Sequence, residues 1–269
     1  MPELKLDITM SLDGFVAGPN QTLEEPLGKA GERLHEWVYG LKAWREPHGL
    51  EGGEENDDSR MVEDGIAATG AVVMGRRMFS GGQGPWEDDP NAHGWWGDTP
   101  PFGVPVFIVT HHPREKVVKE GGTTFTFVTE GIESALEKAR EAAKERNVAV
   151  AGGASLAQQY LKAGLMDEMQ IHIAPLLLGG GVRLFDDLEG IELEQTGVVH
   201  SPAVTHVRYK IKRWPSRSPW SPASTSSTSR LGTSRGRPSS TEPCSAWPNP
   251  STTGRGPAAS SRPATSRCR

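Results

Sequence analysis

Short apolar segments and amphipathic segments alternate along the first 213 residues. The segments 71–75, 104–110 and 148–153 are almost wholly apolar, which is typical of strands buried on both faces of a parallel sheet. Because helix-like segments separate most strands, the pattern predicts an α/β fold with a mostly parallel sheet flanked by helices. The last strands follow each other without a helix, so we expect an antiparallel C-terminal edge. Further strands are predicted at 4–10, 124–128, 167–181 and 204–213.

Helices are predicted where apolar residues recur every three or four positions. This spacing predicts one amphipathic helix over 31–46 and another over 129–147, whose first turn Thr129 is expected to cap. The remaining helical segments are 59–70, closed by Gly70, a helix that begins at Arg76, and 155–164, stopped by Gly164.

The composition changes sharply near Trp214. Residues 214–269 are rich in Ser, Pro and Arg and show no hydrophobic periodicity, so we expect a low-complexity, disordered tail. A translated wrong reading frame is a second interpretation of the tail, and weak contact of its arginines with RNA is a third. The chain is therefore divided into a domain at 1–213 and a tail at 214–269.

Charge and composition exclude several classes of protein. The 269-residue chain has a net charge of −5, which argues against nucleic-acid binding. It contains no run of about 20 apolar residues and no N-terminal signal pattern, so a cytoplasmic protein is expected. The two cysteines, Cys244 and Cys268, lie in the tail, so no disulfide framework or zinc site is predicted.

Three turns that follow buried strands carry the candidate chemistry. They are Gly75-Arg76-Arg77, the segment that begins Thr110-His111, and Gly152-Gly153-Ala154-Ser155. The carboxyl ends of parallel strands share one edge of a sheet, where ligands bind. Glycines before a helix let the backbone approach a diphosphate, and Arg76 or Arg77 can pair with a ribose 2′-phosphate. The turns thus favour NADPH over NADH, although each alone also fits a tight packing turn or a solvent-exposed pair of arginines.

Other catalytic signatures are missing from the sequence. It has no G-x-S-x-G elbow, no P-loop, no G-x-G-x-x-G fingerprint and no H-E-x-x-H motif. The histidines also lack the spacing of zinc ligands, so no metal site is predicted.

Several segments together resemble the dihydrofolate reductase-like superfamily. They are ITMSLDGFVAGPN at 8–20, VVMGRRMF at 72–79, VFIVTHHP at 106–113, the stretch from Ala149 to Phe185, and THVRYK at 205–210. The chain is most similar to the reductase domain of bifunctional riboflavin-biosynthesis deaminase/reductases and to its free-standing bacterial relatives. The resemblance covers most of residues 1–213, in the same order.

The resemblance implies an NADPH-dependent reductase and assigns roles to residues. Gly152 and Gly153 match a glycine pair that lies against the cofactor, Gly75 to Arg77 match the turn that holds the adenosine 2′-phosphate, and Thr110 and His111 match the turn beside the adenine. The loop at 11–18 matches a mobile loop over the nicotinamide.

Dihydrofolate reductases donate a proton from a carboxylate on the first helix. Glu36, with His35 beside it, is the candidate here, and Asp13 is a second. Glu36 also fits an ordinary solvent-facing helix residue, and Asp13 fits a residue that shapes its turn. The expected substrate is a small heterocyclic or carbonyl compound, such as a pyrimidine with a ribose-derived chain or a pterin.

Two further regions are candidates for substrate contact. The loop at 81–103 carries Trp86, His93, Trp95 and Trp96, and its aromatic residues suit a lid, a stacking surface or a dimer contact. The second region surrounds Trp44, His48 and Glu51. A homodimer is expected from the relatives. The rival hypotheses are a flavin- or other nucleotide-binding enzyme, and a nucleotide-binding protein without reductase activity.

Overall fold

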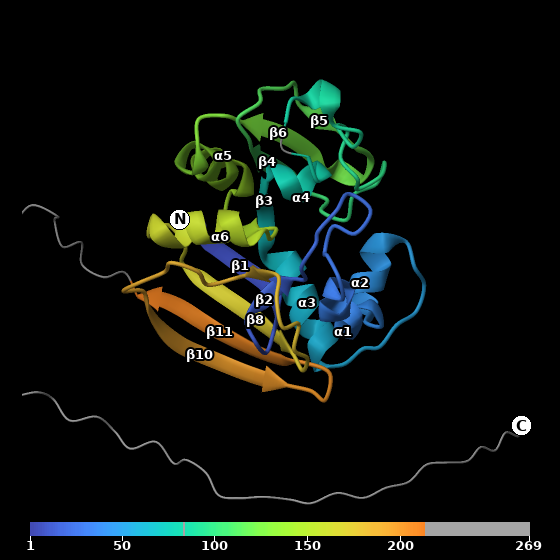
Figure 1. Cartoon of the computed structure of the whole chain (residues 1–269), viewed down its shortest axis with the longest axis vertical. Coiled ribbons are helices and arrows are strands. Elements are labelled where there is room, and N and C mark those ends of the chain that lie inside the picture. Colours follow the sequence, from blue (N-terminus) through green and yellow to red (C-terminus); the bar gives the residue numbers. More distant parts are fainter. Residues whose placement is uncertain (83, 213–269) are drawn as a thin grey trace, which may run out of the picture. The chain divides into compact units, whose positions relative to one another are not determined.

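A nine-stranded sheet runs through the protein, whose computed structural model describes residues 1–82 and 84–212 (Figure 1). The strand order is β10-β11-β8-β1-β7-β3-β4-β6-β5. The six strands from β8 to β6 are parallel, and β10, β11 and β5 run antiparallel to their neighbours. The strands are β1 (Leu4–Ser11), β3 (Thr69–Gly75), β4 (Pro105–Val109), β5 (Val117–Val118), β6 (Thr124–Val128), β7 (Asn147–Val150), β8 (Glu168–Ala174), β10 (Glu192–His200) and β11 (Thr205–Lys212), and a small separate sheet pairs β2 (Phe15–Ala17) with β9 (Val182–Arg183).

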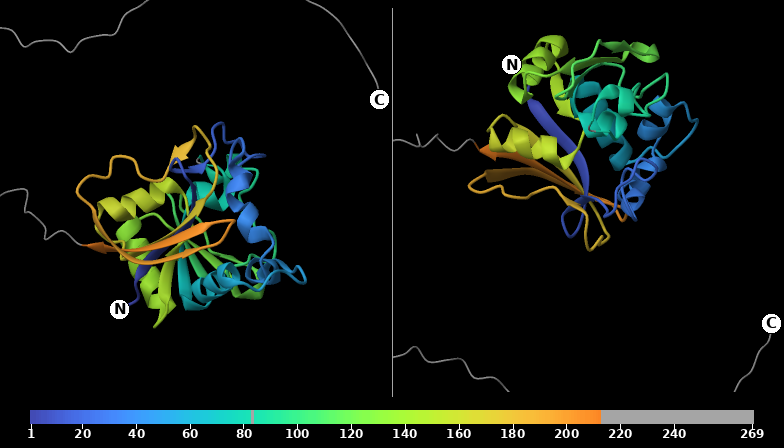
Figure 2. Two further views of the ribbon diagram at one scale, coloured as in Figure 1. Left: turned by 90° about the horizontal axis from the view of Figure 1, so that it is seen from below. Right: turned by 45° about the horizontal axis from the view of Figure 1, so that its top comes forward.

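Helices cover both faces of the sheet, and α6 and α3 lie on opposite sides (Figure 2). The helices are α1 (Glu36–Tyr39), α2 (Lys42–Arg45), α3 (Asp57–Ala68), α4 (Arg76–Ser80), α5 (Ile132–Ala143) and α6 (Ala154–Lys162), with short 3-10 turns η1 (Gly31–His35), η2 (Glu46–His48), η3 (Trp86–Asp88) and η4 (Glu120–Gly122). None of the helices within residues 1–82 and 84–212 is long and apolar enough to cross a membrane.

Strand β3 shows why the central strands are apolar throughout. Its Ala71 and Val73 belong to the core that includes α5 and α6. Its Val72 and Met74 face a second core around Phe79 of α4. A strand buried on both faces has no polar alternation, which is the pattern found at 71–75. The predicted α/β class, the mostly parallel sheet and the antiparallel C-terminal edge are confirmed.

The segment 31–46 corrects the prediction of a single helix. It is divided into η1, α1 and α2, with a break at Gly40 and Leu41. Leu41 is extended and forms a bridge with Glu54, and the amide of Glu54 donates to the carbonyl of Gly40. The apolar spacing is real, but this pairing across the chain interrupts the helix.

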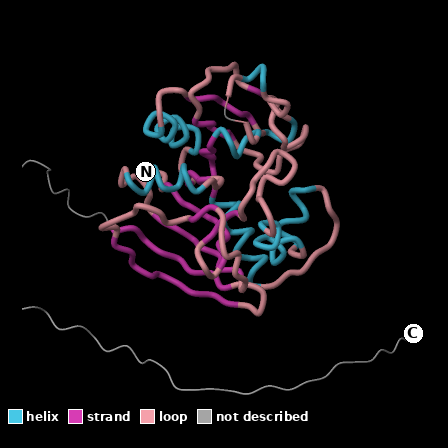
Figure 3. Tube along the Cα trace, in the orientation of Figure 1, coloured by secondary structure: helices cyan, strands magenta, loops and turns pink. Residues whose placement is uncertain are grey.

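Two smaller details also differ from the sequence prediction. The cap of α5 is Gly131, at a φ of 100°, rather than Thr129. Strand β10 was not predicted, because among the described strands it pairs with β11 alone and is almost wholly exposed, so its residues lack an apolar face. Figure 3 shows the β10–β11 hairpin at one edge of the sheet. The predicted boundary at 213 and the tail at 214–269 lie outside the described residues.

Candidate active site

A short central strand opens the sheet. Strand β7 pairs with β1 only from Leu4 to Leu6, and with β3 only from Thr69 to Val73. Both neighbours continue beyond this pairing, β1 to Ser11 and β3 to Gly75. Because β7 ends at Val150, no strand fills the space between β1 and β3 at their carboxyl ends, among the residues that the structure describes.

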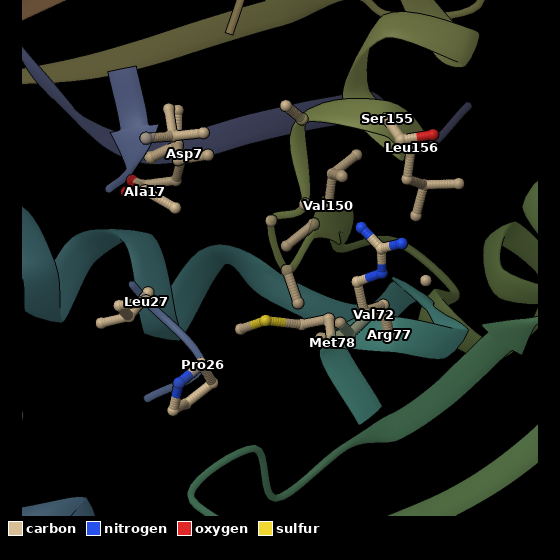
Figure 4. Close-up of a pocket in the computed structure, with 18 of the residues that line it drawn as sticks. Asp7, Ala17, Pro26, Leu27, Val72, Arg77, Met78, Val150, Ser155 and Leu156 are labelled. Carbon is tan, nitrogen blue, oxygen red and sulfur yellow. The ribbon is translucent and has the colours of Figure 1, made fainter. Parts of the chain in front are cut away.

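A groove of about 1640 Å³ lies at this opening. Figure 4 shows its two ends: Asp7, Ala17, Pro26 and Leu27 on one side, and Arg77, Ser155 and Leu156 on the other. All nine predicted cofactor residues line this one groove: Gly75, Arg76, Arg77, Thr110, His111, Gly152, Gly153, Ala154 and Ser155. Three turns that are far apart in the sequence therefore meet, although their role in binding stays a prediction.

The glycine turn at Gly152 and Gly153 has an uncrowded surface. Gly152 and Gly153 have φ values of 90° and 83°, which L side chains rarely adopt. A Cβ on either residue meets no described heavy atom within 4 Å, so internal crowding does not explain the pair. Helix α6 starts directly after Gly153, and no described side chain caps its first turn. Its first amides and the positive end of its dipole suit an anionic group.

The two adjacent arginines have different surroundings. Arg76 is buried, its Nη2 lies 2.5 Å from Oδ2 of Asp89, and its guanidinium lies 3.6 Å from the ring centroid of Trp86. Arg77 is exposed, and its guanidinium points toward the Ser155 end of α6 (Figure 4). Of the two arginines that the sequence left open as phosphate ligands, Arg77 is thus the one whose charge is not already paired within the core.

The turn after β4 has a fixed shape. The hydroxyl of buried Thr110 accepts a hydrogen bond from the amide of His112 at 3.1 Å. His111 is exposed at the rim of the groove. Thr110 therefore shapes the turn, and His111 is an exposed residue of the groove lining.

The predicted proton donors lie outside the groove lining. Glu36 is exposed, with 66% of its side-chain surface accessible, and its Oε1 lies 3.9 Å from Nε of Arg33. Asp13 accepts hydrogen bonds from the Ser11 hydroxyl and from the amides of Leu178 and Gly179, at 2.6, 3.1 and 2.7 Å. The Ser11 hydroxyl is the main group that lowers the pKa of Asp13, to about 2. Asp13 thus pins its loop as an ionised acceptor, and a catalytic role for either carboxylate stays a prediction.

The tryptophan-rich loop forms one wall of the groove. The indole of Trp86 covers Arg76 and donates to the carbonyl of His112 at 3.0 Å. Trp95 lines the groove and donates to the carbonyl of Met78 at 2.9 Å, and Trp96 lines it as well. In this structure the loop is a packed wall.

The second predicted region also reaches the groove. Trp44 and His48 line it and stack with ring centroids 3.9 Å apart, and Tyr39 packs edge-on against Trp44. His35 lines the groove nearby, and its buried Nδ1 has no hydrogen-bond partner among the described residues. Burial lowers the pKa of His35, which favours the neutral ring.

A chain of four polar side chains was missed by the sequence reasoning. Asp7 on β1, His172 on β8, His206 on β11 and Asp58 on α3 form consecutive hydrogen bonds. Asp7 and His172 line the groove. The available signal was a polar residue within each of the apolar strands MQIHIA and THVRY, but only the strand register puts His172 opposite His206.

Comparison with known proteins identifies the family. The family model described as RibD C-terminal domain matches residues 2–207. A 63-residue stretch is 35% identical to the uncharacterized protein YwjB of Bacillus subtilis, covering 23% of this chain and 36% of that protein. The chain thus aligns with about a third of the length of this curated relative.

One solved structure shows the same fold, and a second is reported beside it. A putative riboflavin biosynthesis protein from Shewanella sp. PV-4 superposes with a TM-score of 0.50 at 21% identity, covering 78% of this chain and 99% of that one. A deaminase/5-amino-6-(5-phosphoribosylamino)uracil reductase from Thermotoga maritima has a TM-score of 0.45 at 13% identity, with 78% and 56% covered. Because the family model matches residues 2–207, this chain belongs to the RibD C-terminal domain family.

Proposed function

We propose that the protein is an NADPH-dependent reductase of a small heterocyclic or carbonyl substrate. The observation that carries the proposal is the meeting of the glycine turn, the free start of α6 and the exposed Arg77 in one groove of a RibD-type domain. A bound reduced nicotinamide supplies a hydride. The chain's own part is to hold the two reactants together and to keep water away from them.

The residues present fit such a dinucleotide. The first amides of α6 and the unhindered faces of Gly152 and Gly153 suit a diphosphate. Arg77 is proposed as the ligand of a ribose 2′-phosphate, because its planar guanidinium pairs with phosphate oxygens. Thr110 and His111 are proposed to border the adenine.

The substrate is proposed to be a pyrimidine with a ribose-derived chain, or a pterin. The aromatic surface of Trp44, His48 and Tyr39 suits a flat ring, and the neutral His35 offers an unpaired nitrogen.

We also propose that the protein acts as a homodimer, as the family resemblance suggests. Sedimentation of the full chain at twice the monomer mass would support this, and sedimentation at the monomer mass would refute it.

The test is calorimetry with NADPH and NADH on the full chain and on Arg77→Ala. Loss of one charge-assisted pair of about 1.5–3 kcal/mol should weaken NADPH by roughly 10- to 100-fold and leave NADH within about threefold. Arg60→Ala is the matched control, because Arg60 is exposed but does not line the groove. Equal losses for both nucleotides would refute the 2′-phosphate role.

The neighbouring variant separates binding from folding. Arg76→Ala leaves the buried carboxylate of Asp89 without its cation, so it should cost about 3 kcal/mol of unfolding free energy, whereas Arg77→Ala should cost less than about 0.5 kcal/mol. Chemical denaturation measures both.

NADPH oxidation with 5-amino-6-(5-phosphoribosylamino)uracil and dihydrofolate then tests the reductase activity itself. Binding of NADPH without its oxidation by either compound would favour the nucleotide-binding alternative.

A further inference from the structure

We propose that Asp7 and His172 share a transferable proton and that Asp7 donates it to the substrate. His206 and Asp58 are positioning residues that fix the hydrogen-bonding state of His172. The proposal rests on the proposed reductase function, and it assigns to that reaction a proton source that sequence reasoning did not find.

The four side chains form an unbroken chain from the core to the groove. Nε2 of His206 lies 3.0 Å from Oδ1 of Asp58, and Nδ1 of His206 lies 2.5 Å from Nδ1 of His172. Nε2 of His172 lies 2.6 Å from Oδ1 of Asp7. Asp58, His172 and His206 are at most 4% exposed, whereas 49% of the Asp7 side-chain surface is accessible. The chain thus has one buried end and one end at the groove.

The buried end fixes the first donor. Asp58 lies in the first turn of α3, where the positive end of the helix dipole stabilises a carboxylate. An ionised Asp58 only accepts hydrogen bonds, so Nε2 of His206 carries a proton and donates it to Asp58. Burial lowers the pKa of His206, which keeps this ring neutral. Nδ1 of His206 is then unprotonated and acts as an acceptor.

The remaining roles follow from the first. Because Nδ1 of His206 accepts, Nδ1 of His172 carries the proton of the bond between the rings. The last bond, between Nε2 of His172 and Asp7, needs a third proton on one of its two atoms. Two ionised carboxylates and two neutral imidazoles carry only two protons. Three hydrogen bonds therefore hold one proton more than the ordinary ionisation states supply, and it lies at the groove.

Neighbouring side chains surround the two imidazole rings and Asp7. The indole of Trp37 packs over both rings, with centroid distances of 4.9 and 5.2 Å, and donates to Thr9. Asp7 Oδ2 also accepts from the Gln170 side chain at 3.3 Å. The surrounding titratable groups are His35 from η1, and Lys5, Asp64, Glu168 and Arg208, which border a small second cavity beside Asp7.

The transfer step balances in protons and electrons. As a substrate carbon gains a hydride, the adjoining heteroatom becomes basic. The O–H bond of Asp7 breaks, its electron pair stays on the Asp7 oxygen, and the proton forms a bond to that heteroatom. A proton from solvent in the groove then restores the third proton. Asp7 lies at the end of the groove opposite Arg77 and Ser155, as Figure 4 shows, so it faces the part that a substrate would fill.

The first test needs no substrate. Side-chain ¹⁵N NMR of the histidine-labelled full chain at neutral pH should show protonated Nδ1 on His172 and protonated Nε2 on His206. The Nε2 signal of His172 should differ between the wild type and Asp7→Asn, because the variant removes the carboxylate that shares the proton. Asp64→Asn is the matched control, because Asp64 borders the second cavity but not the groove. An unprotonated Nδ1 on His172, or an Nε2 signal of His172 that is unchanged in Asp7→Asn, would overturn the proposal.

The second test is kinetic and uses 5-amino-6-(5-phosphoribosylamino)uracil and dihydrofolate as probes. Asp7→Asn should lower kcat by about 100-fold or more and leave the Kd for NADPH within about twofold. His206→Leu should lower kcat by about tenfold and shift the acid limb of the pH profile, and His206→Gln should restore most of that loss, because its amide can both donate to Asp58 and accept from His172.

The two proposals fail in different ways. If the wild-type chain oxidises NADPH with a probe and Asp7→Asn does so equally fast, the proton assignment is wrong and the reductase stands. If the wild-type chain binds no NADPH, the reductase proposal fails, and the NMR comparison of the wild type with Asp7→Asn still decides whether the third proton exists.

Discussion

One end of the groove is walled by backbone and the other by side chains. At the Gly152–Ser155 end, two glycines with positive φ and the uncapped start of α6 present main-chain groups, with Arg77 as the adjacent charge. At the Asp7 end, the wall continues into a chain of carboxylates and imidazoles. The backbone end suits a ligand that is the same in every turnover, while the side-chain end can hold and release a proton.

The two ends of the groove also differ in how far apart their residues lie in the sequence. Gly152 and Ser155 are three positions apart, whereas Asp7 and His172 are 165 apart and Asp58 and His206 are 148 apart. The backbone end depends on one turn, and the side-chain end depends on the register of β1, β8 and β11.

The largest expected effect on NADPH affinity comes from a change in the glycine turn at the backbone end of the groove. Gly153→Ala forces a side chain into a conformation with φ of 83° and ψ of 107°, at a cost of about 1–3 kcal/mol, and puts a methyl group into the groove. NADPH affinity should fall by roughly 10- to 100-fold in calorimetry, while the Asp7–His172 NMR signals stay unchanged.

A matched glycine provides the control. Gly190 also has a positive φ, of 73°, and a Cβ there meets no described atom within 4 Å, but it does not line the groove. Gly190→Ala should lower the stability of the protein without lowering its affinity for NADPH. If both variants lower the NADPH affinity equally, backbone strain explains the effect, and contact of the glycine turn with the nucleotide does not.

A smaller effect concerns the side-chain end of the groove and is seen in the pH dependence of protein stability. Burial holds the pKa of His206 below 6.5 in the folded protein, so the unfolded chain takes up a proton that the folded one refuses as the pH falls. The stability that this ring contributes is present above about pH 6.5 and is lost below it, by at most about 1.4 kcal/mol per pH unit. Urea unfolding at pH 5 to 8 should show a flatter acid limb in His206→Gln than in the wild type; identical limbs would contradict a neutral buried His206.

The smallest expected effect concerns Glu36. If Asp7 is the donor, Glu36→Gln should change kcat by less than about twofold, because Glu36 is exposed and does not line the groove. Steady-state NADPH oxidation measures this. A loss near 100-fold in Glu36→Gln with normal turnover in Asp7→Asn would reverse the assignment and restore the carboxylate expected from the resemblance.

The sequence predicted the fold and one end of the groove for a physical reason. Apolar strands, the helix at 154–162 and the Gly152-Gly153 turn are each encoded by adjacent residues. The break at Leu41 depends on its pairing with Glu54, and the exposed strand β10 depends only on its pairing with β11. The link from Asp58 to Asp7 likewise needs three strands in register, and no local pattern encodes it.

The central claim is that the three turns on one rim together bind a phosphorylated dinucleotide. Titration of the full-length wild-type chain with NADPH in a calorimeter tests this most directly. The account predicts saturable binding at one site per chain, tighter for NADPH than for NADH by at least about tenfold. Folded protein that takes up neither nucleotide, or that binds both equally well, would contradict it.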